Sequence, residues 1–160
     1  MLGPADLLGG TNRGDMMYKP EFVKPVRFKL LTAGTPPSRG TSQSAGYDLC
    51  ARGTYFMRDF YTIVPLGVAI EIPEGHVGLL TLRSSARTKL GLETGGLGII
   101  DADYRGELMM HIEGEPGTRI VDGQRIAQLV IVPCVIAPIM LVEELSDTGR
   151  GEGGFGSTGV

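Results

Sequence analysis

The stretch ELMMHIE at residues 107–113 shows the alternation from which the fold can be read. Leu108, Met110 and Ile112 share one side of an extended chain, and the mostly polar residues between them share the other. A period of two residues is typical of a β-strand with one face in the core and one toward solvent. We therefore predict a half-buried strand over these seven residues.

Apolar runs of strand length recur on both sides of this segment. Residues 126–132 are nearly all apolar, which indicates a strand buried on both faces. Residues 135–142 form another run, in which Pro138 marks an edge or a bulge. The remaining predicted strands are residues 26–31, 68–72 and 77–82.

Turn residues separate these strands. PLG at residues 65–67 and PEGH at residues 73–76 are the clearest predicted turns. Only residues 84–90 have a helical pattern, with Ser84 or Ser85 as its cap and Gly91 at its end. The chain has 25 glycines and 10 prolines, which favours many short elements. An all-β fold with one short helix is the prediction.

Bulk composition limits the classes of function. A chain of 160 residues suits one domain with a real core. The net charge of −3 and the lack of a basic stripe disfavour a protein that binds duplex nucleic acid, but one small anion needs only a few local Arg and Lys residues. Cys50 and Cys134 lie in apolar contexts, which predicts buried thiols rather than a zinc site. We expect a soluble, cytoplasmic protein, because neither a signal peptide nor a membrane span is apparent.

The two ends of the chain lack the apolar pattern of the middle. We expect residues 1–24 to be a poorly structured extension and residues 25–145 to be the β domain. Residues 146–160 are glycine-rich and are predicted to be a flexible tail.

Five segments contain polar residues that packing alone does not explain. SAGYDL at residues 44–49 places Asp48 among small and apolar neighbours, where a carboxylate needs a basic partner or a metal-bound water, or stabilises a turn. RSSARTK at residues 83–89 brings two serine hydroxyls and basic residues to a helix start. That arrangement suits an anion, and it also suits an ordinary serine cap.

The third segment is GGLGIIDADYRG at residues 95–106. Its glycines let the backbone approach a ligand closely. Asp101 would emerge at the end of a strand, where it could act as a general base for a water molecule. Tyr104 offers a flat ring to a sugar or a base. The alternative is a tight, Asp-rich hairpin turn without a ligand.

The fourth and fifth segments lie near the C-terminus. The fourth is GQRIAQL at residues 123–129, in which Gln128 stands inside an apolar strand. Because an unpaired buried amide costs about 1–3 kcal/mol, Gln128 is either a bonded core amide or a site residue. RGEGGFGSTG at residues 150–159 could wrap phosphates through backbone N–H groups, with Phe155 stacking on a base, or could be a disordered tail. It lacks the Lys and the helix of a P-loop, which argues against an ATPase.

In this order, the five segments resemble the five motifs of the trimeric dUTPase family, over about residues 26–159. The resemblance implies a distorted jelly-roll-like β-barrel with one short helix, assembled as a homotrimer with active sites between subunits. It implies Mg²⁺-dependent hydrolysis of dUTP to dUMP and pyrophosphate, by attack of water at the α-phosphorus. Such a reaction keeps dUTP low and supplies dUMP for dTTP synthesis.

The resemblance also implies roles for single residues. Asp101 would activate the water, Tyr104 would pack under the deoxyribose and exclude a 2′-hydroxyl, and Asp48 would lie near Mg²⁺ through water. The glycine-rich hairpin would read uracil with backbone groups, and the tail would close over a site built by the other two subunits. The substrate-binding residues would be Arg83, Ser84, Ser85, Gly95, Gly98, Ile100, Tyr104, Gln128, Arg150, Phe155, Gly156, Ser157 and Thr158.

Some residues depart from the family pattern, and three competing hypotheses stay open. Gly95 stands where many relatives have a polar residue, and Gln124 replaces a common Asp. The dCTP deaminases share the fold and the RSS segment, but their catalytic Glu would fall at His111. The second hypothesis is a binding protein without activity, and the third is a purely structural trimer. The presence of both Asp101 and Tyr104 argues against these two.

Overall fold

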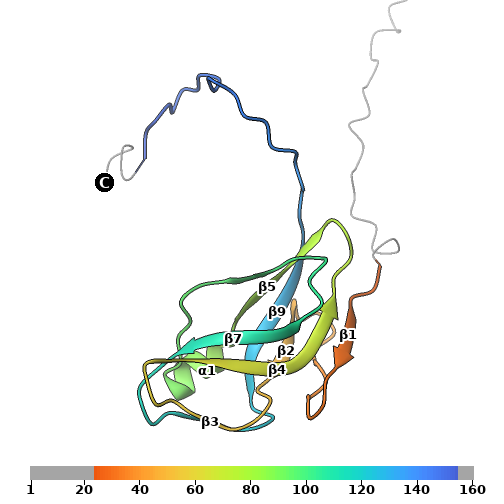
Figure 1. Ribbon diagram of the computed structural model, residues 1–160, viewed down its shortest axis with the longest axis vertical. Helices are drawn as coiled ribbons and strands as arrows, with labels where there is room; N and C mark the ends of the chain where they lie inside the picture. Colours follow the sequence, from red (N-terminus) through yellow and green to blue (C-terminus); the bar gives the residue numbers. More distant parts are fainter. Residues whose placement is uncertain (1–23, 155–160) are drawn as a thin grey trace, which may run out of the picture.

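The computed structural model describes residues 24–154, which form three antiparallel sheets and one short helix (Figure 1). The sheets have the strand orders β1–β4–β7, β2–β9–β5–β6 and β3–β8. In chain order the elements are β1 (Arg27–Leu30), β2 (Gly46–Cys50), β3 (Tyr55–Phe56), β4 (Tyr61–Glu71), β5 (His76–Leu82), α1 (Ser84–Leu90), β6 (Gly98–Ile100), β7 (Glu107–Glu113), β8 (Arg119–Ile120) and β9 (Arg125–Pro133). The prediction of an all-β fold with one short helix is confirmed.

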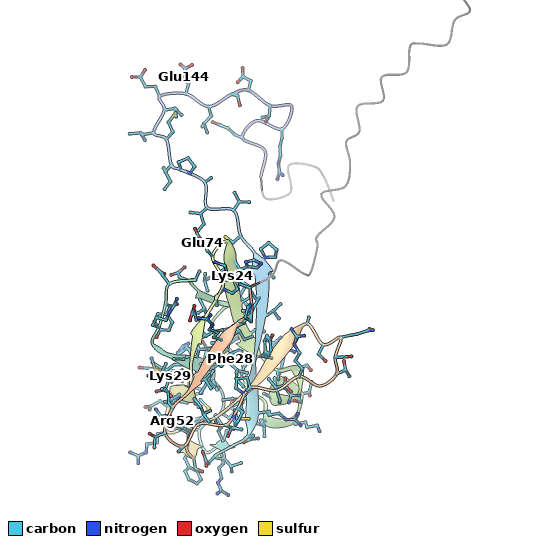
Figure 2. All side chains as sticks on the ribbon, turned by 90° about the vertical axis from the view of Figure 1, so that its right-hand side faces the viewer. Lys24, Phe28, Lys29, Arg52, Glu74 and Glu144 are labelled. Atoms are coloured by element: carbon cyan, nitrogen blue, oxygen red, sulfur yellow. The ribbon has the colours of Figure 1, made fainter. Side chains whose placement is uncertain are left out.

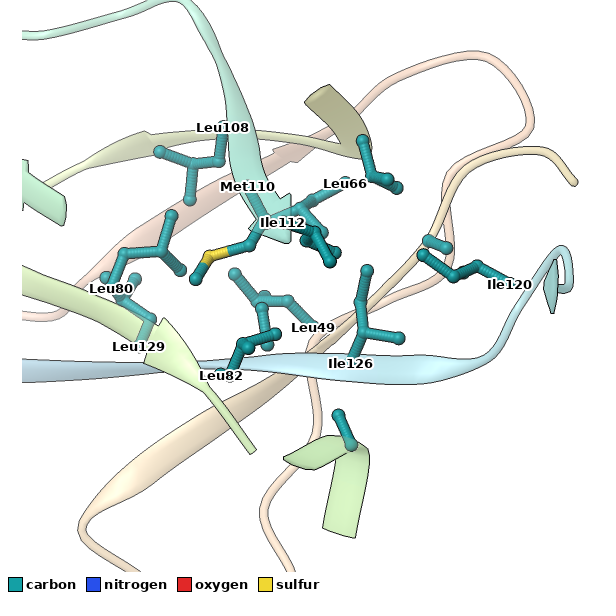
Figure 3. Packing of buried hydrophobic residues seen from close by; sticks show 14 of the residues in the cluster. Leu49, Leu66, Leu80, Leu82, Leu108, Met110, Ile112, Ile120, Ile126 and Leu129 are labelled. Carbon is teal, nitrogen blue, oxygen red and sulfur yellow. The ribbon is translucent and has the colours of Figure 1, made fainter. Parts of the chain in front are cut away.

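The two larger sheets enclose one hydrophobic core (Figure 3). Leu108, Met110 and Ile112 of β7 point into it, as their alternation predicted. Leu80 of β5 and Leu129 of β9 meet them from the other sheet. All five side chains are buried, and full burial of such a side chain contributes about 1.5–3 kcal/mol. This packing fixes the two sheets relative to each other.

β9 lies in the middle of the second sheet, with β2 on one side and β5 on the other. The prediction that it is buried on both faces is correct for Ile126 and Ala127, which are inaccessible. Val130 and Val132 are only half-buried, because alternation turns them away from the core that holds Leu129.

One predicted turn is wrong, because residues 65–67 lie inside β4. The pairing of β4 with β7 shifts between Pro65 and Ala69, so the chain forms a bulge and continues. Gly67 has a φ of 68°, which glycine adopts at no steric cost. The Pro65 carbonyl accepts a hydrogen bond from the Arg52 N–H (2.8 Å). The bulge therefore tolerates proline and glycine in the middle of a long strand. The other predicted turn, at residues 73–76, is present.

The helix α1 has the predicted bounds, but it starts differently. Gly91 ends it in the left-handed conformation (φ 63°), as predicted. The predicted serine cap is wrong: the N-cap residue is Arg83, and no side chain caps the helix. Instead, the Ser85 hydroxyl accepts a hydrogen bond from the Arg83 guanidinium (3.0 Å).

The regular structure ends at Pro133, and residues 134–154, here called the arm, leave the body of the domain (Figure 1). The strand predicted over residues 135–142 is wrong, because within the described residues no neighbouring strand pairs with this segment. Figure 2 shows Glu144 of the arm far from Lys24 and Glu74 at the end of the sheets. The arm therefore pairs with no strand among the residues that the structure describes.

Both cysteines are free, but only one is buried. Cys50 lies in β2, and its burial raises the pKa of its thiol. Cys134 was predicted to be buried and is exposed, because it is the first residue of the arm.

Two stretches with predicted roles extend beyond the described range. The extension predicted over residues 1–24 is described only at Lys24, and Phe155, Gly156, Ser157 and Thr158 of the tail also lie outside. Within residues 24–154, no helix is long and apolar enough to cross a membrane.

Candidate active site

A small pocket lies where β6 ends and the next turn begins. Its volume is about 190 Å³, and its walls are largely apolar. Asp101 is exposed at its rim, and the ring of Tyr104 is partly exposed beside it. The lining residues are Ile99, Ile100, Asp101, Tyr104, Glu107, Leu108 and Met109. The structure thus brings three of the predicted site residues to one pocket.

Tyr104 is held by contacts within its own turn. Its hydroxyl donates a hydrogen bond to the Glu107 carbonyl (3.0 Å), and its N–H donates to the Asp101 carbonyl (3.2 Å). A Cβ atom at Gly106 would lie 2.3 Å from the tyrosine hydroxyl oxygen. Only glycine at position 106 leaves room for the ring in this place.

Glu107 connects this turn to the bulge in β4. Its carboxylate accepts hydrogen bonds from the Arg52 guanidinium at 2.8 and 2.6 Å, and from the Gly67 N–H at 2.9 Å. The hydrogen bonds that Arg52 donates to Glu107 also raise the pKa of Arg52, so this pair stays charged. The position of Tyr104 is therefore linked to two strands of the first sheet.

The glycine-rich hairpin before β6 is closely packed at two of the predicted site residues. A Cβ atom at Gly95 would lie 2.8 Å from Glu113 Oε1. A Cβ atom at Gly98 would lie 3.2 Å from the Leu80 Cβ. Neighbouring strands thus approach the hairpin backbone directly, and its outer side remains accessible at Gly95 and Leu97.

A second group of predicted residues lies around the start of α1. Asp48 is in the middle of β2, and it is only 5% exposed. Its Oδ1 accepts a hydrogen bond from Arg83 Nε (2.8 Å), and its Oδ2 accepts one from Arg125 Nη1 (3.4 Å). We call Asp48, Arg83, Ser85 and Arg125 the arginine cluster. Two guanidinium groups against one carboxylate leave an excess of positive charge, which suits an anion.

Gln128 lies beside this cluster. It pairs directly with Asp48 across β2 and β9, and with Thr81 on the other side. A Cβ atom at Gly46 would lie 2.4 Å from the Gln128 Cγ, so the glutamine side chain occupies the space that Gly46 leaves free. Within the described residues, no buried side-chain polar atom lacks a partner. Gln128 is half-buried, which leaves it partly accessible.

Two further predicted residues belong to neither group by their side chains. The Ser84 side chain is exposed at the start of α1. Arg150 lies in the arm, where its Nε donates a hydrogen bond to the Gly153 carbonyl (2.7 Å). The lining of the pocket shares no residue with the arginine cluster. A single chain therefore presents two separate groups and an unattached arm.

Sequence reasoning missed three residues of these groups. Met109 lines the pocket, and its place on the outward side of an alternating strand was the available signal. Glu107 and Arg125 stand at the starts of β7 and β9. Charged residues at strand ends are common, so no local pattern distinguishes these two.

The geometry allows a specific division of chemical work. An exposed carboxylate beside a small apolar pocket can accept a proton from a water molecule next to a bound ring system. The arginine cluster can hold an anion. Because the two groups share no residue, a ligand with an apolar ring at one end and a charged chain at the other would need both.

Comparisons with known proteins identify the family of the chain. A protein-family model described as dUTPase matches residues 32–159. The chain is 42% identical over 135 residues to a probable deoxyuridine 5′-triphosphate nucleotidohydrolase of Schizosaccharomyces pombe, covering 82% of this chain and 96% of that protein. It is 39% identical over 135 residues to the deoxyuridine 5′-triphosphate nucleotidohydrolase of Paramecium bursaria Chlorella virus 1, covering 82% and 95%. A solved structure of the Staphylococcus bacteriophage 80alpha dUTPase with dUPNHPP superposes with a TM-score of 0.77 at 34% identity, over 86% of this chain and 100% of that one.

Proposed function

The chain belongs to the dUTPase family and hydrolyses dUTP to dUMP and pyrophosphate, and from this premise we propose that Asp101 and Tyr104 form the centre of its active site. The observation that carries the proposal is the pocket of about 190 Å³ with a carboxylate at its rim and an aromatic ring in its wall. Ligand sites typically measure about 300–1,000 Å³. A pocket this small suits a nucleoside, so the triphosphate must lie on other groups.

In the proposed mechanism, Asp101 is the general base. Its exposed carboxylate takes a proton from a water molecule while the water oxygen attacks the α-phosphorus. The bond from the α-phosphorus to the bridging oxygen breaks, and pyrophosphate leaves with the electron pair. Holding the water and the phosphorus in line converts an encounter between two molecules into a step within one complex.

Tyr104 selects the sugar in this proposal. Its ring is fixed by the hydroxyl contact to Glu107 and by the missing side chain of Gly106. A ring held in this way cannot move aside, so a ribose 2′-hydroxyl would collide with it and UTP would be rejected. The backbone of Gly95, Gly98 and Ile100 would read uracil, because β6 is paired to β5 and leaves its backbone little freedom at Gly98 and Ile100.

The phosphate chain is proposed to lie on the arginine cluster. Arg83, Ser84 and Ser85 would contact phosphate oxygens, and Gln128 would contact the region between phosphate and water. The excess positive charge of the cluster supports this placement. Arg150 of the arm would reach the γ-phosphate. Phe155, Gly156, Ser157 and Thr158, which lie outside the described residues, would close over uracil and phosphates.

We propose that the active form is a homotrimer in which neighbouring subunits complete each site. The pocket and the arginine cluster lie in different parts of one chain, so a neighbour's cluster could serve each pocket. Exposed apolar side chains support an interface there: Met109 (51% exposed) and Ile99 (59%) line the pocket, and Ile63 (55%) lies on β4, the strand that pairs with β7.

The arm gives a second line of support for assembly. Ile139 is 100% exposed and Leu141 98%, which is unusual for apolar residues so close in sequence. We propose that residues 25–145 form the subunit with its connecting segment, and that residues 146–160 form a tail that closes on a neighbour. Residues 1–24 would remain an extension outside this assembly.

We propose Mg²⁺ as the divalent ion of the reaction. Within residues 24–154, no group of three or more His, Cys, Asp or Glu side chains could hold a metal ion. Asp48, the carboxylate expected near the ion, has both oxygens engaged by arginines. The residues present do not form a metal site of their own, so the ion would arrive bound to the triphosphate.

We propose the cytoplasm as the location, since the free thiols of Cys50 and Cys134 persist in a reducing compartment. There the reaction would keep dUTP low and supply dUMP for dTTP synthesis.

Product analysis tests the substrate assignment. Purified protein would be incubated with Mg²⁺ and with dUTP, dCTP, dTTP or UTP in parallel. We expect dUMP and pyrophosphate from dUTP alone. Comparable turnover of UTP would contradict the role of Tyr104, uracil products from dCTP would indicate a deaminase, and no turnover would refute the assignment.

Subunit mixing tests the shared site. Chains with Asp101→Asn and chains with Arg83→Gln would each be nearly inactive, and would be unfolded together and refolded as mixed trimers. If pocket and cluster come from different subunits, mixed trimers contain some intact sites and activity returns. Activity that stays at the level of the unmixed variants would contradict the arrangement.

A further inference from the structure

Asp48 is the one buried charged side chain among the residues that the structure describes. Taking a carboxylate out of water is costly unless basic partners and hydrogen bonds compensate it. Its side chain is 7% exposed, which leaves little surface for a further ligand. The function of Asp48 must therefore be expressed through the groups that already contact it.

The backbone of Asp48 is fixed from both sides. Across one edge of β2 it pairs with Gln128 of β9. Across the other edge, Ser38 N donates to the Asp48 carbonyl (3.2 Å), and Asp48 N donates to the Ser38 carbonyl (2.7 Å). The carboxylate consequently projects from a rigid point of the sheet, next to the proposed phosphate site.

Arg83 is the partner whose orientation depends most on this fixed carboxylate. Its Nε donates to Asp48 Oδ1 (2.8 Å), and its Nη1 donates to Ser85 Oγ (3.0 Å). Its backbone N–H is anchored on the Ile126 carbonyl (2.9 Å). Two of the three guanidinium nitrogens are thus directed into the protein. Nη2 makes no hydrogen bond to any of the described residues, and the side chain is 25% exposed.

We infer that Asp48 is a positioning residue: it orients the Arg83 guanidinium toward the phosphate chain of the substrate, and it does so without the metal ion. The inference rests on the proposed function of the arginine cluster. A guanidinium that is already oriented loses less freedom when phosphate binds, so its contribution to affinity is larger. Arg125, at 3.4 Å from Oδ2 and more exposed, balances the carboxylate from the other side.

The test measures binding of a non-hydrolysable α,β-imido analogue of dUTP by calorimetry, once with Mg²⁺ and once with EDTA. We expect Asp48→Asn to weaken binding about tenfold or more, by a similar factor in both buffers. The Mg²⁺ concentration for half-maximal tightening should stay as in the unaltered protein. If metal-free affinity is unchanged and only the Mg²⁺ requirement rises, Asp48 faces the metal and the inference is wrong.

A second variant keeps the test valid if Asp48→Asn fails to fold. Arg83→Lys retains the charge but cannot contact Asp48 and Ser85 with one planar fork. We expect Arg83→Lys to weaken binding of the analogue by a factor similar to that of Asp48→Asn. The double variant with both substitutions should lose much less affinity than the product of the two separate factors. If Arg83→Lys binds the analogue as tightly as the unaltered protein does, the inference is wrong.

A matched control removes a carboxylate elsewhere. Asp59 is exposed, and Asp59→Asn should bind the analogue as the unaltered protein does. If the unaltered protein itself does not bind the analogue, the proposed function fails and the inference fails with it. If it binds and the Asp48 and Arg83 variants bind equally well, only the inference fails.

Discussion

The turn at residues 101–107 and the arm at residues 134–154 differ in how far the chain itself holds their side chains in place. In the turn, Tyr104 bonds to Glu107, and Arg105 Nη1 donates to the carbonyls of Ala102 (2.7 Å) and Tyr104 (2.8 Å). In the arm, only the Cys134 N–H bonds to the rest of the described domain, at the carbonyl of Gly75 in the turn between β4 and β5 (2.8 Å).

This difference shows which functional groups one chain can prepare alone. The turn has its geometry before any ligand or partner arrives, so it can provide the chemistry. The apolar residues of the arm contact no surface among the described residues, so under the proposed assembly the arm takes its geometry from a neighbouring subunit. We therefore expect changes in the turn to act on the chemical step, and changes in the arm to act on assembly and closure.

The largest expected effect is in the turn. Asp101→Asn removes the proposed base, and kcat should fall about 10²–10⁴-fold while nucleotide binding persists, because the amide has nearly the same shape. Steady-state kinetics and calorimetry would measure the two quantities. Asp103→Asn, also exposed in this turn, is the control and should retain most activity. Near-normal turnover by Asp101→Asn would remove this residue from the mechanism.

Next comes removal of residues 149–160 from the end of the arm. Activity should fall about 10²-fold, because the remaining site no longer excludes water or aligns the phosphates. The free energy of unfolding should change by less than about 0.5 kcal/mol, since the described residues of this segment, 149–154, lie outside the strands and the hydrophobic core. Kinetics and denaturant titration are the measurements. A shortened chain with full activity would show that the tail is not a lid.

An apolar residue of the arm should affect assembly and not folding. Leu141→Asp places a charge where we propose a contact with a neighbouring subunit, and should weaken the trimer about tenfold or more. Analytical ultracentrifugation at several concentrations would measure this. Ser146→Asp adds the same charge at a polar position of the arm and should leave the trimer intact. Equal stability of both trimers would contradict the proposed role of the arm.

A smaller effect is expected for the packing inside the turn. Gly106→Ala introduces a Cβ atom 2.3 Å from the Tyr104 hydroxyl oxygen, so the ring must shift. The ratio of kcat/KM for dUTP over UTP should fall about tenfold, as expected when one positioning contact is lost. Gly40→Ala, where a Cβ atom meets nothing closer than 3.4 Å, is the control. Unchanged discrimination would mean that the ring position does not exclude UTP.

The smallest effect should come from a residue in neither region. Burial raises the pKa of the Cys50 thiol in the folded state. Folding is then favoured fully below the ordinary thiol pKa of about 8.5, and this contribution is lost as pH rises through the raised value. Denaturant titrations between neutral and alkaline pH should show the loss in the unaltered protein and not in Cys50→Ala. If the unaltered protein and Cys50→Ala lose stability equally as the pH rises, the loss comes from other groups.

The sequence predicted the strands whose partners lie in the same chain. The alternation of Leu108, Met110 and Ile112 is a local pattern, and burial in the core follows it directly. The turn predicted at residues 65–67 failed because the bulge depends on contacts from Arg52 and Glu107, which are distant in sequence. The strand predicted at residues 135–142 failed because an apolar run does not reveal whether a strand of the same chain pairs with it.

The site was predictable in kind but not in arrangement. A motif could mark Asp101 and Tyr104 because both stand in one turn. The partners of Asp48 could not be read in the same way, because Arg83 and Arg125 come to it from a helix start and from another strand. The order of residues along the chain does not reveal that two guanidinium groups bind the same carboxylate.

The missing side chain at Gly46 also bears on how this sequence can change during evolution. The Gln128 side chain fills that space, with 2.4 Å between its Cγ and a Cβ atom built at position 46. Any larger residue at position 46 would therefore displace the Gln128 side chain, although each position looks tolerant when considered alone. We expect lineages that replace Gly46 to have first replaced Gln128 by a smaller residue, so the history of one position constrains the other.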